Sequence, residues 1–169
     1  MKILFFCRRF WPLIGGVEKH VLEISKRLIE KGNKITIVTE WSKDDGGFKG
    51  FEEFERIDIY RIPITASERL KKFQIWQWLW KNRKLINEAD IVHCHDVFYW
   101  YLPFRFLYPR KKVFTTFHGY EGSRPPGGKQ ILSHKMGGWL SNGNITIGGW
   151  HEKWYRVKSD IVSYGAVDK

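Results

Sequence analysis

The chain has 169 residues, the length of one domain and enough to bury a hydrophobic core. It carries a formal net charge of +11, and 17% of its residues are aromatic, including nine tryptophans. No run of about 18 apolar residues or signal-peptide pattern appears, so neither a membrane-spanning helix nor a cleaved leader is predicted. A basic, tryptophan-rich surface suits an anionic partner, which is a phosphorylated ligand, a nucleic acid or an anionic membrane surface.

Seven apolar segments are predicted to be β-strands, and several of them are continuous runs without polar alternation. Such runs are typical of a parallel sheet that is buried on both faces. In chain order the strands are predicted at residues 2–7, 34–39, 57–62, 90–95, 112–117, 144–147 and 160–163. Because Cys7 and Cys94 lie within two of these strands, we expect buried thiols in a reducing cytoplasm and no disulfide bond.

Helical patterns alternate with the strands. The first helix ends at Gly32, and its apolar residues recur at helical spacing: Val17, Val21, Ile24 and Leu28. A second helix is predicted over residues 68–87, and shorter helices over residues 96–107, 129–140 and 150–157. This alternation predicts an α/β fold with a doubly wound, mainly parallel Rossmann-like sheet flanked by helices. Residues 43–55 and 119–128 are predicted to be long loops.

Two glycines, Gly15 and Gly16, close the first strand–helix connection. A helix N-terminus attracts phosphate or carboxylate, and glycine permits positive φ and the close approach of an anion. A tight turn without any ligand explains the same residues equally well. Neither dinucleotide-binding nor P-loop sites are predicted, since G-x-G-x-x-G and G-x-x-x-x-G-K-[ST] are absent. Just inside the helix, Glu18 complements the helix dipole, and His20 is either a structural or a ligand-binding histidine.

Histidines stand at the ends of two further strands. The sequence DIVHCHD places His93 and His95 on one strand face and Cys94 on the other. The sequence TTFHGYEG places His118 at the same sheet edge as the paired glycines, where an imidazole followed by Gly119 and a loop can reach a sugar hydroxyl or a phosphate. A histidine that only caps a strand is the alternative. No tight Cys spacing or HExxH motif accompanies these residues, so no metal is predicted.

Several segments, in this order, resemble the GT4-type glycosyltransferases, which are retaining enzymes of the GT-B fold. RRFWPLIGGVEKHVLEISKRLIEKGNKITIVTE is similar to the opening pattern of that family, and DIVHCHD to its central strand. VFTTFHG is similar to its Thr-x-His-Gly element. ITIGGWHEKWYRVKSDIVSYGAVD resembles the last strand, helix and strand before its interdomain linker. The resemblance therefore covers essentially the whole chain.

The resemblance implies a two-domain enzyme in which the N-terminal domain mainly binds the acceptor and the C-terminal domain binds the nucleotide sugar. Residues 1–169 then correspond to the Rossmann-like acceptor-side domain and end at the interdomain linker. The donor-binding domain is expected to be a further part or a separate subunit, and the alternative is a protein that has lost transfer activity. In either case this chain alone is expected to be inactive. The resemblance also implies a nucleotide-sugar substrate and a glycan or lipid-linked acceptor, with no cofactor.

The same resemblance suggests roles for individual residues. The N–H groups of Gly15 and Gly16 would face the donor diphosphate, and His118 would be the catalytic residue that hydrogen-bonds the transferred sugar or the acceptor. The leaving phosphate can accept the proton in retaining transfer, so no general base is predicted here. The remaining candidates would line the acceptor side of the cleft: Glu18, His20, His95, Asp96, Gly119, Tyr120 and Glu121.

The predicted second helix is unusually basic and aromatic. Its three tryptophans are Trp76, Trp78 and Trp80, and its basic residues include Lys71, Lys72, Lys81, Arg83 and Lys84. The apolar residues spread too far round the helix for a single core-facing stripe. The segment FYWYLPFRFLYPRKK has a similar composition. Such segments suit the headgroup region of a bilayer, so a cytoplasmic protein docked at the inner face of the membrane is one hypothesis. The other hypothesis is that these aromatics pack inside the domain or against the donor-binding half.

Three functions fit the sequence. The first is the acceptor-side half of a glycosyltransferase, and the second is a non-enzymatic binding domain for a phosphorylated or glycan ligand. The third is nucleic-acid binding, which rests on the net charge of +11 alone. Since the basic residues are dispersed and no RNP, KH or zinc-finger pattern is present, no nucleic-acid partner is predicted.

Overall fold

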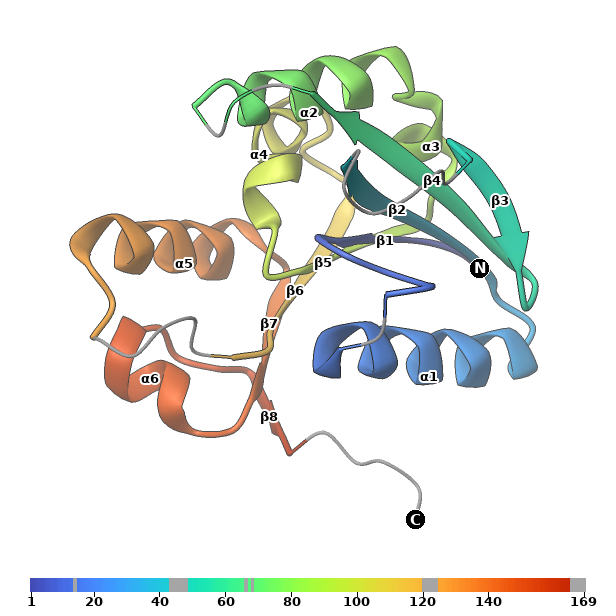
Figure 1. Cartoon of the computed structure of the whole chain (residues 1–169). Coiled ribbons are helices and arrows are strands. Elements are labelled where there is room, and N and C mark those ends of the chain that lie inside the picture. Colours follow the sequence, from blue (N-terminus) through green and yellow to red (C-terminus); the bar gives the residue numbers. More distant parts are fainter. Residues whose placement is uncertain (14, 43–48, 66, 68, 120–124, 165–169) are drawn as a thin grey trace.

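The structure is a computed structural model that describes residues 1–13, 15–42, 49–65, 67, 69–119 and 125–164. The described residues form one eight-stranded sheet with helices on both faces (Figure 1). The strands are β1 (Lys2–Cys7), β2 (Lys34–Ser42), β3 (Phe51–Phe54), β4 (Ile57–Ile64), β5 (Ile91–His95), β6 (Lys112–Phe117), β7 (Gly143–Ile147) and β8 (Ile161–Ser163). The helices are α1 (Gly16–Glu30), α2 (Lys71–Lys81), α3 (Lys84–Glu88), α4 (Phe98–Leu107), α5 (Gly128–Leu140) and α6 (Trp150–Tyr155).

The strand order is β3-β4-β2-β1-β5-β6-β7-β8, and every pairing is parallel except that of β3 with β4. The chain leaves β1 toward β2 and β4, and later returns to build β5 to β8 on the other side. The order therefore reverses between β1 and β5, where Cys7 lies opposite His95. In open α/β sheets, ligands bind outside the carboxyl ends of the strands at such a reversal.

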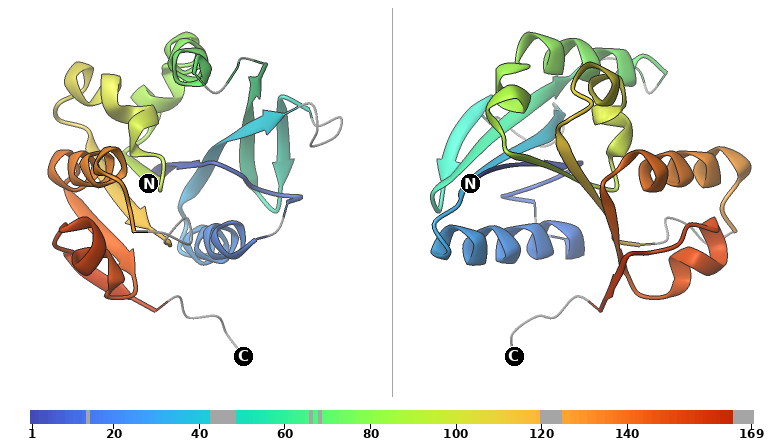
Figure 2. Two further views of the ribbon diagram at one scale, coloured as in Figure 1. Left: turned by 60° about the vertical axis from the view of Figure 1, so that its left-hand side comes forward. Right: turned by 180° about the vertical axis from the view of Figure 1, so that it is seen from behind.

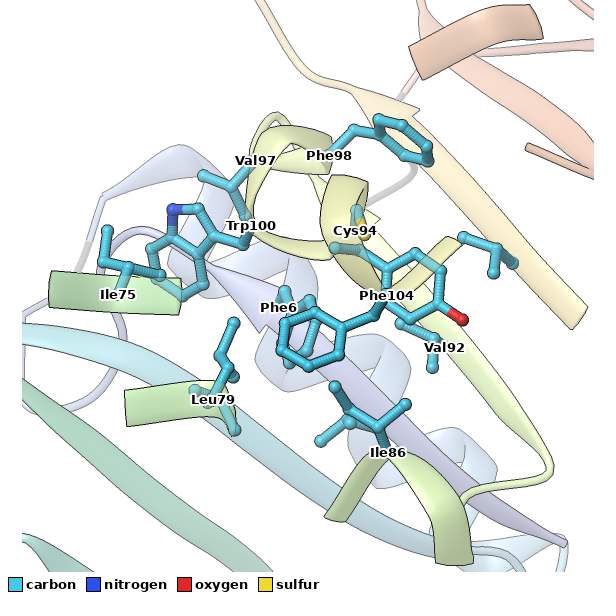
Figure 3. Packing of buried hydrophobic residues seen from close by; sticks show 14 of the residues in the cluster. Phe6, Ile75, Leu79, Ile86, Val92, Cys94, Val97, Phe98, Trp100 and Phe104 are labelled. Atoms are coloured by element: carbon cyan, nitrogen blue, oxygen red, sulfur yellow. The ribbon is translucent and has the colours of Figure 1, made fainter. Parts of the chain in front are cut away.

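Alternate residues of the strands supply two separate cores. Leu4 and Phe6 of β1 pack in the larger core, under α2, α3 and α4 (Figure 3). Phe5 and Cys7 point to the opposite face and pack in the second core, under α1. Figure 2 shows α1 on the opposite side of the sheet from α2 and α4. The sheet is thus buried on both faces near its centre, as the continuous apolar strands predict.

The predicted fold class and all seven predicted strands are confirmed, with strand ends that shift by at most a few residues. One strand was missed, because β3 lies within the stretch predicted as a loop over residues 43–55. Its sequence FEEF carries two glutamates that argue against a strand. In the structure Glu52 forms an ion pair with the guanidinium of the buried residue Arg61 on β4. This tertiary contact, which local sequence does not reveal, stabilises the strand.

The helix predicted over residues 68–87 is wrong in extent, since it is two helices, α2 and α3. The helix α2 ends at Asn82, whose side-chain amide donates to the carbonyl of Trp78 over 2.9 Å. Its core side is formed by Ile75 and Leu79, which are buried. The three tryptophans divide: Trp78 is half-buried, Trp76 donates its indole N–H to the carbonyl of Tyr99 over 2.9 Å, and Trp80 is exposed.

The aromatic segment after β5 packs inside the domain, which was the alternative to membrane docking. Within α4, Phe98, Trp100, Tyr101 and Phe104 are buried in the larger core. Both cysteines are buried and free, and burial raises the pKa of each thiol, so they are core thiols as predicted. Within the described part of the chain, no helix has both the length and the apolar character that crossing a membrane requires.

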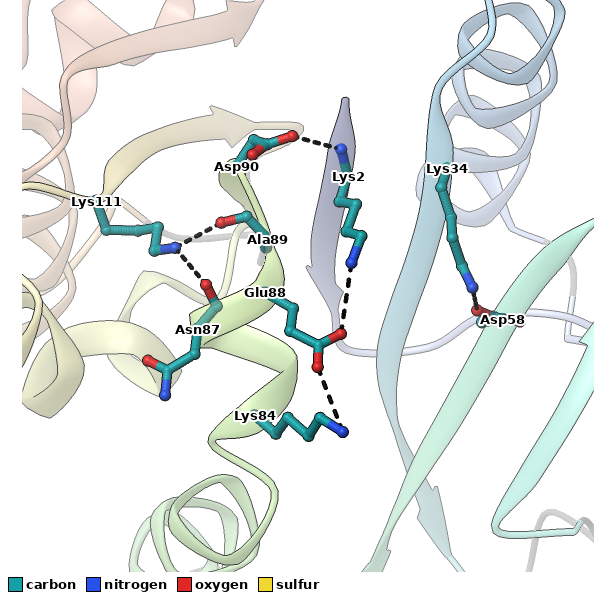
Figure 4. Close-up of polar contacts among 9 residues, drawn as sticks. All are labelled: Lys2, Lys34, Asp58, Lys84, Asn87, Glu88, Ala89, Asp90 and Lys111. Carbon is teal, nitrogen blue, oxygen red and sulfur yellow. Dashed lines mark hydrogen bonds and ion pairs between the residues drawn. The ribbon is translucent and has the colours of Figure 1, made fainter.

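The amino-terminal edge of the sheet is held by polar contacts (Figure 4). The backbone N–H of Lys2 donates to Asp90 over 2.8 Å, and the ammonium of the same residue lies 3.6 Å from Glu88 at the end of α3. On the next strands, Lys34 and Asp58 pair at 2.9 Å. These charged groups are therefore paired with one another at the amino-terminal edge of the sheet.

Candidate functional site

The strand ends β5 and β6 place three predicted residues beside one another. His95 is the last residue of β5, Asp96 follows it, and His118 comes directly after β6. Asp96 has a φ of 60°, in the left-handed region that few residues other than glycine adopt. From this position its carboxylate accepts the backbone N–H of His118 over 2.9 Å, and its own N–H donates to the carbonyl of Thr116 over 3.0 Å. Asp96 therefore ties the two strand ends together.

Four histidine rings gather behind this edge. Nδ1 of His95 lies 2.8 Å from Nε2 of His118, a hydrogen bond between the two rings. His93 stacks on His95 with ring centroids 4.5 Å apart, and its Nε2 lies 2.7 Å from the hydroxyl of Thr116. The ring of His20 on α1 meets His118 edge to face at 4.8 Å. The sequence pattern had placed His93 and His95 on one face, and the stacking confirms it.

These imidazoles are neutral at physiological pH. Burial, with smaller contributions from His20 and His93, lowers the pKa of His118 to about 3. Burial, with a smaller contribution from His20, lowers the pKa of His93 to about 4. Burial also lowers the pKa of His20, and the pKa of His95 lies well below its ordinary value for the same main reason. A neutral ring both donates and accepts, so His118 can hydrogen-bond a hydroxyl but carries no positive charge for a phosphate.

The glycine turn differs in one respect from the prediction. Gly15 caps α1 in an extended conformation, with φ of −124°, and neither Gly15 nor Gly16 is among the glycines with positive φ. The positive φ that glycine permits is therefore not used at this turn, and close approach is the remaining reason for glycine. A Cβ on Gly15 would lie 2.5 Å from a carboxylate oxygen of Glu18, whereas a Cβ on Gly16 would have open space. Glu18 thus folds back on the start of its own helix, as a residue that complements the helix dipole does.

Six of the predicted residues divide between two hollows on either side of the start of α1, whereas Gly15 and Gly119 line neither. The first, which we call the α1–β8 groove, has a volume of about 600 Å³ and includes Gly16, His20 and His118 in its lining. The second, the cationic cavity, has a volume of about 590 Å³ and includes Glu18, His95 and Asp96. Val17 lines both.

Some residues that line the site were not predicted from the sequence, and some predicted residues lie outside the part of the chain that the structure describes. The cationic cavity is also lined by five basic residues that were not predicted to belong to the site: Arg8, Arg9, Lys71, Lys72 and Lys129. Lys71 and Lys72 were noted only as part of the basic aromatic helix, and the pair Arg8-Arg9, directly after β1, was a further available signal. Gly119 is half-buried after His118, and Tyr120 and Glu121 lie outside the described residues. In the described ranges, no three His, Cys, Asp or Glu side chains are grouped to hold a metal ion, and the absence of a metal or cofactor stays a prediction.

Known proteins resemble this chain in sequence and in fold. The phosphatidylinositol N-acetylglucosaminyltransferase GPI3 subunit of Saccharomyces cerevisiae is 29% identical over 97 residues, which are 56% of this chain and 21% of that protein. A glycosyltransferase from Rickettsia africae has a TM-score of 0.58 at 18% identity, covering 95% of this chain and 41% of that one. An alpha-glucosyltransferase solved with UDP and a 13-mer DNA has a TM-score of 0.52 at 18% identity, covering 96% and 41%.

The sheet and its helices thus have the Rossmann-like architecture of one domain of the GT-B fold. The family model of Glycosyltransferase Family 4 matches residues 14–147, and the chain belongs to this family. It spans about a fifth of the length of the GPI3 relative. The structural likenesses show the fold alone, so the DNA in one of them leaves the nucleic-acid prediction untested.

Proposed function

We propose that this chain is the acceptor-side domain of a retaining glycosyltransferase that moves a sugar from a nucleotide sugar to a glycan or lipid-linked acceptor. The observation that carries the proposal is that Gly16, His20 and His118 line one groove at the carboxyl edge of the sheet. Open N–H groups at the start of α1 suit the charge on a departing diphosphate, and the neutral ring of His118 suits a sugar hydroxyl. The reaction as proposed uses no metal or other cofactor.

Transfer also requires a donor-binding domain or subunit. The α1–β8 groove supports this part of the proposal, because its far wall includes Ile147, Ser163 and Tyr164, and the side chain of Tyr164 is 84% exposed. A second domain packed across the groove would cover this wall and bring the nucleotide sugar to Gly16. The yeast relative is named as a subunit, which is in keeping with an enzyme assembled from more than one chain.

We further propose that the cytoplasmic domain docks on the inner face of an anionic membrane. The helix α2 supports this, since Phe73 and Trp80 expose 62% and 51% of their area beside Lys72 and Lys81. Leu70, immediately before the helix, is 58% exposed. Aromatic and lysine side chains together at a surface suit the headgroup region. Flotation with anionic vesicles at low salt tests this: the chain should float, and Phe73→Ser should reduce the floating fraction. A chain that stays at the bottom contradicts the docking.

A transfer assay tests the main proposal. The chain is supplied with a donor-binding half of the same family, and transfer of labelled sugar is measured with and without this chain. Gly16→Val and His118→Ala should each reduce transfer about a hundredfold, the scale of losing one charge-stabilising group. Gly50→Val is the matched control, because a Cβ there also meets open space but far from the groove. Normal transfer by both variants would show that Gly16 and His118 take no part in the reaction. Ligand binding by this chain without rescue by any donor half would favour a non-enzymatic binding domain instead.

A further inference from the structure

The cationic cavity lies at the point where the strand order reverses. It opens at the ends of β1 and β5, between Arg8 and Arg9 on one side and His95 and Asp96 on the other. Its lining holds five basic residues and only two acidic ones, Glu18 and Asp96. The cavity is thus an uncommon concentration of positive charge in a position where open α/β sheets bind ligands.

Only part of this charge is neutralised within the protein. Lys71 pairs with Glu40 at 2.6 Å, and Arg8 lies 3.9 Å from the same carboxylate. The carboxylate of Asp96 already accepts the N–H of His118. By contrast, three of the basic side chains have no carboxylate partner among the described residues: Arg9, Lys72 and Lys129. These three are exposed, so they can turn toward a ligand.

Helix starts add to the positive field. The helices α1, α2, α4 and α5 all begin at this edge of the sheet (Figure 1), and each has ten or more residues. First-turn or capping residues of all four line the cavity, among them Val17, Lys72, Val97 and Lys129. Each helix N-terminus carries about half a positive charge. Charged side chains and helix dipoles therefore point to the same kind of ligand, an anion.

One buried polar atom in the cavity wall is also unsatisfied. His95 is 1% exposed and lines the cavity, and its Nε2 has no hydrogen-bond partner in the described structure. Its other nitrogen, Nδ1, bonds His118, which faces the α1–β8 groove. A pair of hydrogen-bonded rings, one in the lining of each hollow, thus links the cationic cavity to the α1–β8 groove.

We propose that the cationic cavity binds a phosphate group carried by the acceptor itself, so that the acceptor is a phosphate ester. This inference rests on the proposed function, in which the groove beyond His118 holds the donor diphosphate. The phosphate would be bound by Arg9, Lys72 and Lys129, and the acceptor would extend past His95 and His118 toward the transferred sugar. The exposed Leu70 and Phe73, on either side of the two cavity lysines of α2, would suit the apolar part of a lipid phosphate. A soluble phosphate ester presents the same group.

Binding to this chain alone tests the inference. One arm titrates inorganic phosphate by calorimetry, and the other measures flotation with phosphatidylcholine vesicles that contain phosphatidylinositol. The variants Arg9→Gln and Lys72→Gln each remove one cavity charge. Lys31→Gln is the matched control, because it removes the same charge from the far end of α1. All three side chains are exposed, so the variants should fold.

Each cavity variant should weaken binding about tenfold, which is the scale of a hydrogen bond to a charged group, while Lys31→Gln should not. Weakened binding in the phosphate arm identifies a site that takes a free phosphate ester. Weakened binding of Arg9→Gln in the vesicle arm alone identifies a lipid phosphate, because Arg9 lies outside the docking helix α2. If the wild type binds neither probe, or if the cavity variants match Lys31→Gln in both arms, the inference is overturned. The proposed function survives that result if His118→Ala still reduces transfer about a hundredfold, so the two can fail separately.

Discussion

His95 and His118 are joined ring to ring, with Nδ1 of one 2.8 Å from Nε2 of the other. Both rings are neutral, so one nitrogen of the pair donates and the other accepts. The backbone of His118 is fixed as well, since its N–H donates to Asp96. His118 therefore enters the α1–β8 groove with its position set by a buried neighbour that does not line that groove.

The first prediction concerns this pair. His95→Phe keeps a ring of similar size beside Phe5 but removes the hydrogen bond, so His118 should lose its single tautomer. The pKa of His118 should stay low, because burial is the main cause of its shift. Nitrogen-15 NMR of the imidazole side chains reports both properties. An unchanged tautomer of His118 in the variant would show that His95 does not position it.

Acid should destabilise the domain through its buried histidines. Besides the edge cluster, His134 on α5 and His151 on α6 hydrogen-bond each other at 2.9 Å, and burial lowers the pKa of each to about 4. The unfolded chain binds protons near pH 6.5 and the folded chain does not, so this stability is complete above about pH 6.5 and is lost as pH falls toward 4.

Urea unfolding at a series of pH values measures this loss. His134→Phe should lower the slope of unfolding free energy against pH in this window, since one linked proton is removed. His134 is packed between Phe117 and Tyr155, so a phenyl ring suits the space. A slope equal to that of the wild type would mean that His134 already titrates normally in the folded protein.

A glycine inside α5 should resist a change that usually stabilises helices. Alanine in place of a mid-helix glycine gains about 0.5–1 kcal/mol, but a Cβ on Gly138 would lie 2.7 Å from a methyl group of buried Val157. Gly138→Ala should therefore lower the free energy of unfolding by about 1–3 kcal/mol. In a Val157→Ala background the methyl is gone, and the same change should be neutral or stabilising. An equal cost in both backgrounds would refute the contact.

The two sides of α2 should respond differently to truncation. Leu79→Ala should lower the free energy of unfolding by about 2–5 kcal/mol, because this side chain is 1% exposed in the larger core. Trp80→Ala should cost about 1 kcal/mol or less, because the side chain of Trp80 is 51% exposed. Chemical denaturation compares them, and similar losses would mean that α2 packs with another face against the sheet.

The edge of the sheet could be predicted because parallel strands end on the same side. Once β1, β5 and β6 are recognised, Gly16, His95 and His118 must lie at one edge of the sheet, because each follows or ends one of these strands. No knowledge of tertiary contacts is needed to place them there. The strand β3 and the break after α2 could not be found in the same way. They depend on a partner for Glu52 and on the side chain of Asn82, which are contacts that only the folded chain supplies.

The cationic cavity was harder to foresee for a related reason. Arg9 follows β1, whereas Lys72 and Lys129 lie in the first turns of α2 and α5, and each looks in sequence like an ordinary solvated residue. Only the sheet order brings them round one hollow. The net charge of +11 indicated an anionic partner, but the sequence did not show where that partner would bind.

The most direct test of the account is transfer of labelled sugar by this chain together with a donor-binding half, with His118→Ala compared against Gly50→Val. The account predicts transfer that depends on both parts, that falls about a hundredfold in His118→Ala and that is unchanged in Gly50→Val. Transfer at the wild-type rate by His118→Ala would contradict it, because the groove at the edge of the sheet would then have no part in the reaction.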